Sequence, residues 1–142
     1  MNIYAIVILT ALLLDYFLNF VADRLNLQAL HPELPAEFEG VYDAEAYRRS
    51  QEYTRVHTHF GLLTSTCMLA ITLLFWFAGG FQLLDALVRQ WDLGVIGNGL
   101  AYIGLLSLGR GLIGLPFSLY ETFGIEARFG FNKTTFATFL SD

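Results

Sequence analysis

The three histidines, His31, His57 and His59, are the side chains in this sequence most readily used for metal binding or acid–base catalysis. His57 and His59 are two positions apart, which on a helix places them about 200° apart around the axis. Metal-binding helices use a spacing of four, and the HExxH sequence, in which two histidines bind zinc and a glutamate acts as base, is absent. His31 belongs to a distant loop. We therefore expect the histidines to be interfacial or solvated, with no catalytic residue and no metal site in this chain.

Two ionisable residues, Asp15 and Arg110, occur inside long apolar stretches. An unpaired charge there costs at least about 2.5 to 3.5 kcal/mol, so each needs a partner or water. At the helical rise per residue, Asp15 lies roughly 9 Å from Val21 and Arg110 roughly 13 Å from Leu119, toward the same side of the membrane. We interpret them as an ion pair or as part of a shared water-filled chamber, with Asn19 one turn from Asp15 on the same face. The alternative is that each side chain extends to the headgroups, which is easier for arginine than for aspartate.

These residues are carried by three apolar runs, at about 3–21, 60–81 and 95–119. Each is close to the roughly 20 residues that a helix needs to cross a bilayer. The hydrophobic content of 55% and the mean hydropathy of +0.51 exceed those of an ordinary soluble domain. A soluble helical bundle is the alternative, but the second run contains no charged side chain at all. The sequence predicts an all-α integral membrane protein with three transmembrane helices and a helical connection.

Positive charges predict the orientation of these helices. Arg24, Arg48, Arg49 and Arg55 lie in the connection 22–59, and Arg128 and Lys133 lie in the tail 120–142. The connection between the second and third runs carries only Arg89. The positive-inside rule then places the N-terminus outside the cytoplasm or in a lumen, and the connection 22–59 and the tail in the cytoplasm. The net charge of -5, without a basic cluster, excludes nucleic acid as a partner.

Local signals predict where the helices begin and end. Asp43 is a candidate N-cap for a helix over 44–57 that leads into the second run. Gly79-Gly80 should end that run, and 82–92 should form a short connection with Trp91 at the membrane interface. The third run is rich in small residues on one face, which lets helices approach closely. Those residues are Gly97, Ala101, Gly104, Ser107, Gly111 and Gly114.

The end of the third run carries a recognisable pattern. Leu115-Pro116-Phe117-Ser118 is followed by Tyr120, Phe123, Ile125-Glu126 and Gly130-Phe131-Asn132-Lys133. This segment resembles a signature of the integral-membrane CAAX prenyl proteases, and Tyr47, Ser50 and Tyr53 resemble a pattern that precedes that family's second span. The chain is similar in layout to the N-terminal membrane region of these zinc metallopeptidases.

The resemblance implies a helical chamber in the membrane, with zinc, HExxH and a later glutamate downstream of the region that this chain matches. We therefore expect residues 1–142 to be one N-terminal membrane region of a larger metalloendopeptidase, inactive alone, without a cofactor, and contributing chamber wall and substrate access. Zinc would belong to the full-length parent. The implied partners are the lipid bilayer, the remaining C-terminal helices of the parent, and prenylated or membrane-protein substrates. The alternative is a stand-alone membrane scaffold or adaptor that docks a partner through its glycine-rich third helix.

The same resemblance singles out residues of the signature segment for a junction at the membrane surface. Pro116 is expected to kink the third helix, and Asn132 is a candidate N-cap for a following helix. The alternative is that the polar residues here are simply the soluble end of the helix. The selected residues are Pro116, Tyr120, Glu121, Glu126, Asn132 and Lys133.

Overall fold

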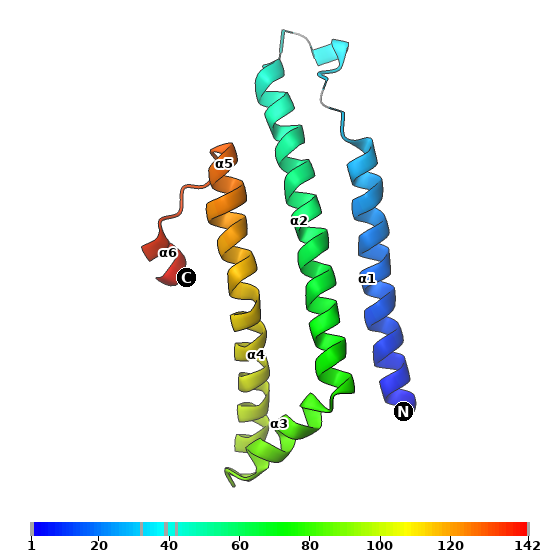
Figure 1. Cartoon of the computed structure of the whole chain (residues 1–142), viewed down its shortest axis with the longest axis vertical. Helices are drawn as coiled ribbons and strands as arrows, with labels where there is room; N and C mark the ends of the chain where they lie inside the picture. The colour runs from blue at the N-terminus through cyan, green and yellow to red at the C-terminus, as the bar shows by residue number, and fades with distance from the viewer. Residues whose placement is uncertain (1, 32, 39, 42, 142) are drawn as a thin grey trace. The chain divides into compact units, whose positions relative to one another are not determined.

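The computed structural model describes residues 2–31, 33–38, 40–41 and 43–141, and in these residues the regular structure is entirely helical (Figure 1). This confirms the predicted all-α class. In chain order the helices are α1 (Ile3–Ala29), the 3₁₀ turn η1 (Ala36–Phe38), α2 (Ala44–Phe77), α3 (Gly80–Arg89), α4 (Gly94–Tyr120), the π-helical segment η2 (Glu121–Glu126), α5 (Ala127–Phe129) and α6 (Phe136–Ser141).

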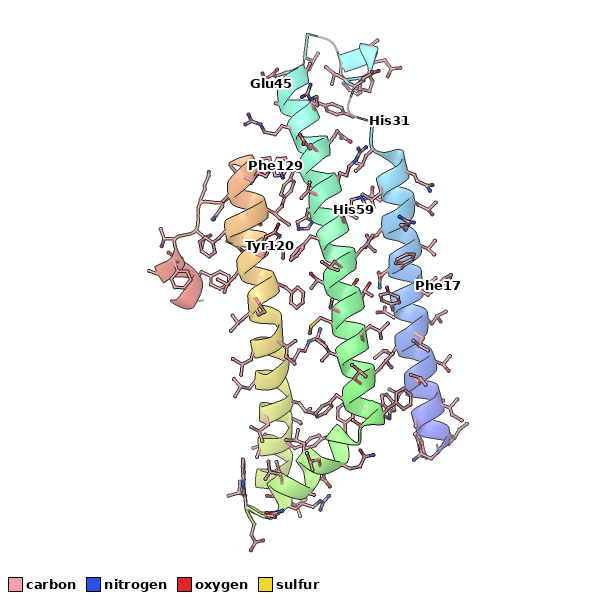
Figure 2. The ribbon with its side chains drawn as sticks, viewed as in Figure 1. Phe17, His31, Glu45, His59, Tyr120 and Phe129 are labelled. Atoms are coloured by element: carbon pink, nitrogen blue, oxygen red, sulfur yellow. The ribbon has the colours of Figure 1, made fainter. Side chains whose placement is uncertain are left out.

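Within the described residues, three helical stretches are long and apolar enough to cross a membrane: Ile3–Ala29, Ala44–Phe77 and Gly94–Phe129. The three predicted spans are thereby confirmed. Their large apolar side chains are mostly exposed, as for Phe17 on α1 (Figure 2). Exposed apolar side chains are stable where lipid replaces water. A helix can present them to lipid because it satisfies its own backbone hydrogen bonds.

The helices differ in length from the apolar runs that predict them. α1 continues beyond Val21 to Ala29, and α2 joins the predicted helix 44–57 to the second span without interruption. The Oδ1 atom of Asp43 accepts a hydrogen bond from the Glu45 amide at 3.0 Å, which confirms Asp43 as the N-cap. α2 ends at Phe77 rather than Phe81, because Gly79 adopts a left-handed φ of +79° that a helix cannot continue through.

The chain divides into two compact units. Unit 1 comprises residues 1–65 and 121–142, and unit 2 comprises residues 66–120. Few apolar side chains are buried in the described residues, and both units contain some of them. They are Leu62, Ile125 and Phe129 in unit 1 and Val88 in unit 2.

Unit 2 contains a helix where a short connection was expected. α3 begins at Gly80 and packs against α4, with Val88 only 1% exposed. The Phe81 ring lies 4.9 Å from the Phe75 ring and 6.0 Å from the Trp76 ring. A Cβ atom added at Gly80 would collide with the Phe75 ring, so the tight corner between α2 and α3 requires glycine there.

The signature segment adopts a more elaborate local structure than its sequence pattern indicates. Pro116 lies inside α4, and the helix then widens into the π-helical η2 before it ends at Gly130. The Phe131 amide donates to the Glu126 carbonyl at 2.9 Å and Gly130, at φ +76°, donates to Ala127 at 3.2 Å. This is the Schellman arrangement that commonly closes a helix at glycine.

The N-cap expected at Asn132 is wrong. Asn132 Oδ1 accepts from the Thr134 amide at 2.6 Å, which makes a turn before α6 rather than its cap. Thr135 takes the capping position, because its Oγ1 accepts from the Thr138 amide at 3.3 Å and α6 begins at the next residue, Phe136.

Candidate functional site

The most specific polar contact of unit 1 joins α2 to η2. His57 Nε2 lies 2.7 Å from Glu121 Oε1, a distance suited to an ion pair when the imidazole is protonated. The two side chains are 43% and 40% exposed, so the described residues cover neither of them fully. The sequence interpretation treated His57 as solvated or interfacial, and the structure adds a defined partner from a distant part of the chain.

An aromatic cluster lies beside this ion pair and reaches it through Tyr53. Tyr53, one turn before His57 on α2, has its ring 5.4 Å from the imidazole. The same ring makes edge contacts with Phe129 at 5.6 Å and with Phe131 at 4.8 Å. Phe129 is 7% exposed, whereas Phe131 is 50% exposed. The Tyr53 pattern on α2 and the signature segment, both taken from the family resemblance, are therefore in direct contact.

Tyr53 lies in the charged first part of α2, ahead of the predicted span 60–81, which contains no charged side chain. Burial raises the pKa of its phenol, and the negative charges of Glu126 and Glu121 raise it further. Each cause acts by disfavouring the phenolate. Tyr53 therefore stays protonated at neutral pH and acts as a packing residue with a hydroxyl rather than as a base.

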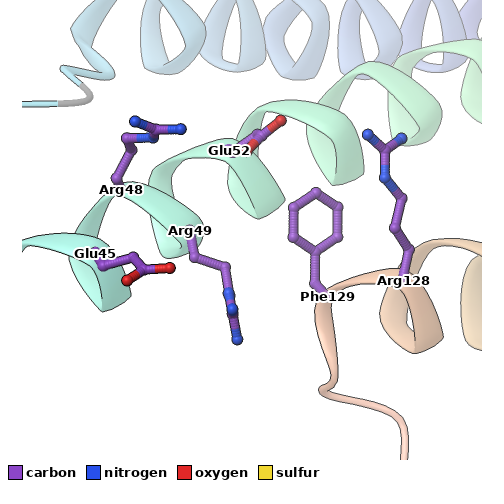
Figure 3. Close-up of a pocket in the computed structure, with 6 residues that line it drawn as sticks. All are labelled: Glu45, Arg48, Arg49, Glu52, Arg128 and Phe129. Carbon is purple, nitrogen blue, oxygen red and sulfur yellow. The ribbon is translucent and has the colours of Figure 1, made fainter.

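A pocket of about 280 Å³ lies beside this cluster (Figure 3). α5 contributes two of its lining residues, and the Arg128 Cζ atom lies 5.5 Å from the centre of the Phe129 ring. In Figure 3 that ring points toward α2. A second pocket, of about 260 Å³, follows along α2 and adds Gln51 and Arg55. The first pocket is lined by Glu45, Arg48, Arg49, Glu52, Arg128 and Phe129.

Arginine and glutamate side chains together set the electrostatics of these pockets, with three arginines and two glutamates in the first. In the described part of the chain, the ion pairs closer than 4 Å are His57–Glu121 and Arg89–Asp85, so the pocket guanidinium groups hold no such partner. Guanidinium groups bind carboxylate and phosphate oxygens through paired N–H donors. An anionic group in the pocket would meet these guanidinium groups beside the carboxylates of Glu45 and Glu52.

The two intramembrane charges lie in different units. Asp15 is exposed on α1 in unit 1, and Arg110 is exposed on α4 in unit 2. Asn19 does not bind the Asp15 carboxylate, because its Nδ2 donates to the Asp15 main-chain carbonyl at 2.9 Å. A direct pair between Asp15 and Arg110, or a chamber that they share, stays a prediction.

The donor set does not fit a metal ion. Among the described residues, no group of three or more His, Cys, Asp and Glu side chains could hold one. His57 and Glu121 offer two ligands, whereas protein zinc sites use at least three protein ligands. His31 and His59 are both exposed and are not part of this pair. We derive no catalytic step from zinc in this chain.

The selected signature residues are distributed along one continuous helix and its end. Glu121 reaches His57, and the Glu126 carbonyl accepts the two amides that follow Gly130. Tyr120, the last residue of α4, and Lys133 are exposed. On sequence grounds we weighed His57 as a metal ligand and gave it no site role, and we did not select Phe129. Tyr53 and His57 are one helical turn apart, and this spacing is the sequence signal that could have placed His57 beside Tyr53.

Comparison with known proteins gives a consistent result. A family described as the CAAX prenyl protease N-terminal region, with five membrane helices, matches residues 23–142. CAAX prenyl protease 1 of Saccharomyces cerevisiae is 29% identical over 137 residues, which cover 89% of this chain and 30% of the relative. The Homo sapiens homologue of CAAX prenyl protease 1 is 32% identical over 120 residues, which cover 77% of this chain and 24% of the relative.

The fold agrees with these sequence relationships. The crystal structure of Ste24p from S. mikatae matches with a TM-score of 0.85 and 25% identity, over 100% of this chain and 35% of that protein. The chain therefore spans about a quarter to a third of the relatives that it matches. Since the family match covers most of the sequence, the chain belongs to the CAAX prenyl protease N-terminal family.

Proposed function

We propose that this chain is the non-catalytic N-terminal membrane region of a zinc metalloendopeptidase of the CAAX prenyl protease type. Residues 1–142 would form one region of that protein and contribute chamber wall and substrate access. Two observations carry the proposal. The family match extends over residues 23–142, and the structural match covers the whole of this chain and only 35% of Ste24p. Prenylated or membrane-protein substrates would be cleaved by the parent protein.

The chamber-wall role is supported by the polar groups of the spans. Asp15 and Arg110 are exposed within the apolar stretches of α1 and α4. Charges in that setting are stable when they face water or a partner inside a helical enclosure. In the full-length protein, the remaining C-terminal helices would complete this enclosure and keep both groups away from lipid.

The substrate-access role is supported by the arginine-lined pocket at the N-terminal part of α2. Arg48 and Arg49 line it from α2 and Arg128 lines it from α5. By the positive-inside rule, this end of the helices would lie in the cytoplasm. The pocket could there receive a carboxylate of an arriving substrate, while zinc and the catalytic glutamate would be supplied by other parts of the parent.

The size of the native protein is the first test. An antibody raised against residues 35–51 should detect a membrane protein tens of kDa heavier than 16.0 kDa. A purified protein of that size should contain zinc and cleave a prenylated CAAX peptide. A native product near 16.0 kDa would instead contradict the protease proposal for this gene product.

The access role has its own test in the full-length enzyme. Replacing both Arg48 and Arg49 by glutamine should raise KM for the peptide several-fold and leave kcat unchanged, because the pocket would act before the chemical step. Arg89→Gln is the matched control, since Arg89 is paired with Asp85 in unit 2 and does not line the pocket. A fall in kcat with KM unchanged would contradict the access role.

The second candidate is a stand-alone scaffold, which the glycine face of α4 favours. Among the described atoms, a Cβ added at Gly104, Gly111 or Gly114 would meet nothing within 4 Å. This face could therefore receive another helix closely, whether from the parent or from a separate partner. A native product near 16.0 kDa in a stable complex, disrupted by Gly104→Leu, would favour the scaffold.

A further inference from the structure

α3 carries an apolar edge that its own unit does not cover. Leu83 is 75% exposed and Leu87 is 47% exposed. They are four positions apart and so lie on one side of the helix. Trp91 continues this spacing just beyond the end of α3 and is 48% exposed. Large apolar side chains in a row along one helix indicate contact with an apolar phase.

The other sides of α3 are different in character. Phe81 and Val88 face the protein, where Phe81 packs on the Phe75 ring and Val88 is buried. The polar side contains Asp85 and Arg89, whose side chains pair at 2.8 Å while remaining largely exposed. Three sides are thus distinct: one packed on the protein, one polar, and one apolar and exposed.

The position of α3 in the chain shows which apolar phase is available. α2 ends at Phe77 and α4 begins at Gly94, and both helices are candidate membrane spans. α3 connects their ends in unit 2 and packs on α4 (Figure 1). Its 10 residues extend for about 15 Å, which is too short to cross a bilayer. The exposed edge therefore lies between the ends of two spans that also expose apolar side chains, such as Leu74 on α2 and Val95 on α4.

We propose that α3 lies in the plane of the membrane interface, with Leu83 and Leu87 in the outer part of the acyl region and Trp91 at the level of the headgroups. The Asp85–Arg89 pair then faces water. An in-plane helix of this kind buries its apolar face a short way into the bilayer. It would fix the corner between α2 and α4 at one depth, and the partner of this surface is lipid rather than protein.

Spin labels on single cysteines test this arrangement in the full-length protein reconstituted in phosphatidylcholine bilayers. Cys67 and any other cysteine are first replaced by serine. Leu83→Cys and Leu87→Cys report on the apolar edge, and Gln82→Cys and Arg89→Cys are matched controls on the polar side of the same helix. Collision rates are measured with oxygen, which concentrates in the bilayer, and with a water-soluble nickel chelate, which is excluded from it.

The expected ratio of oxygen to nickel collisions is several-fold higher at positions 83 and 87 than at positions 82 and 89. Equal ratios on the two sides, with strong nickel collisions throughout, would overturn the proposal and place α3 in water. Low collision rates with both reagents at 83 and 87 would also overturn it, because protein would then cover the edge. Each side has two positions, so a labelled variant that fails to fold can be omitted.

Discussion

Phe129 lies at the end of the third span and its ring contacts Tyr53 on α2. Truncating Phe129 tests how strongly this contact stabilises the end of the helix. The change is Phe129→Ala, and the matched control is Phe131→Ala. Both rings make an edge contact with Tyr53, at 5.6 Å for Phe129 and 4.8 Å for Phe131. They differ in burial, because Phe129 is 7% exposed and Phe131 is 50% exposed.

The expected free energies follow from that difference. Truncating a buried phenylalanine costs about 3 to 5 kcal/mol, because apolar contact is lost and a cavity remains. Truncating a half-exposed one loses roughly half of the transfer term, about 1 to 2 kcal/mol. Each variant also loses one aromatic pair with Tyr53, about 0.5 to 1.5 kcal/mol, which cancels in the comparison. The two variants should differ by about 2 kcal/mol, or roughly 30-fold in the opening equilibrium.

Hydrogen exchange measured by mass spectrometry can read this opening in the full-length protein in detergent. The amides of Gly130 and Phe131 donate to the carbonyls of Ala127 and Glu126, so their exchange requires the end of the helix to open. Peptides covering residues 121–131 should exchange much faster in Phe129→Ala than in Phe131→Ala. If the two variants accelerate exchange equally, or if Phe129→Ala leaves it unchanged, the contact with α2 does not hold this segment.

Three further predictions concern pH and charge. Burial raises the pKa of Tyr53 above its ordinary value of 10.0, so its contribution to stability is present below pH 10.0 and is lost as the pH rises through the raised pKa. Protection of the same peptides should therefore fall at alkaline pH, and Tyr53→Phe should remove the part of that fall due to this phenol. A double-mutant cycle with His57→Gln and Glu121→Gln should give a coupling of no more than about 1 kcal/mol, because both side chains are partly exposed, and a coupling of several kcal/mol would contradict this estimate. Asp15→Arg and Arg110→Asp should each reduce the folded yield in membranes, while the combined swap should restore it if the two side chains pair directly. A double variant no better than either single one would exclude that pair.

The features that the sequence predicted correctly depend on neighbouring residues. The three spans follow from apolar runs that can satisfy their backbone hydrogen bonds internally. The start of α2 follows from Asp43, whose side chain binds an amide two residues away. The corner after α2 follows from Gly79-Gly80, because glycine alone adopts the left-handed conformation there without strain.

The remaining features were decided by contacts between distant segments. The sequence predicted that His57 lies on a helix. Its partner Glu121 could not be predicted, because α3 and α4 separate the two residues along the chain. Phe129 and Phe131 have the same side chain and are two positions apart, yet only Phe129 is buried, because their surroundings in the folded chain differ. α3 was expected to be a short connection, and packing of Phe81 and Val88 fixes which of its sides stays exposed. Sequence periodicity shows which side chains share a face, whereas burial and pairing depend on the path of the chain, which brings separate helices together.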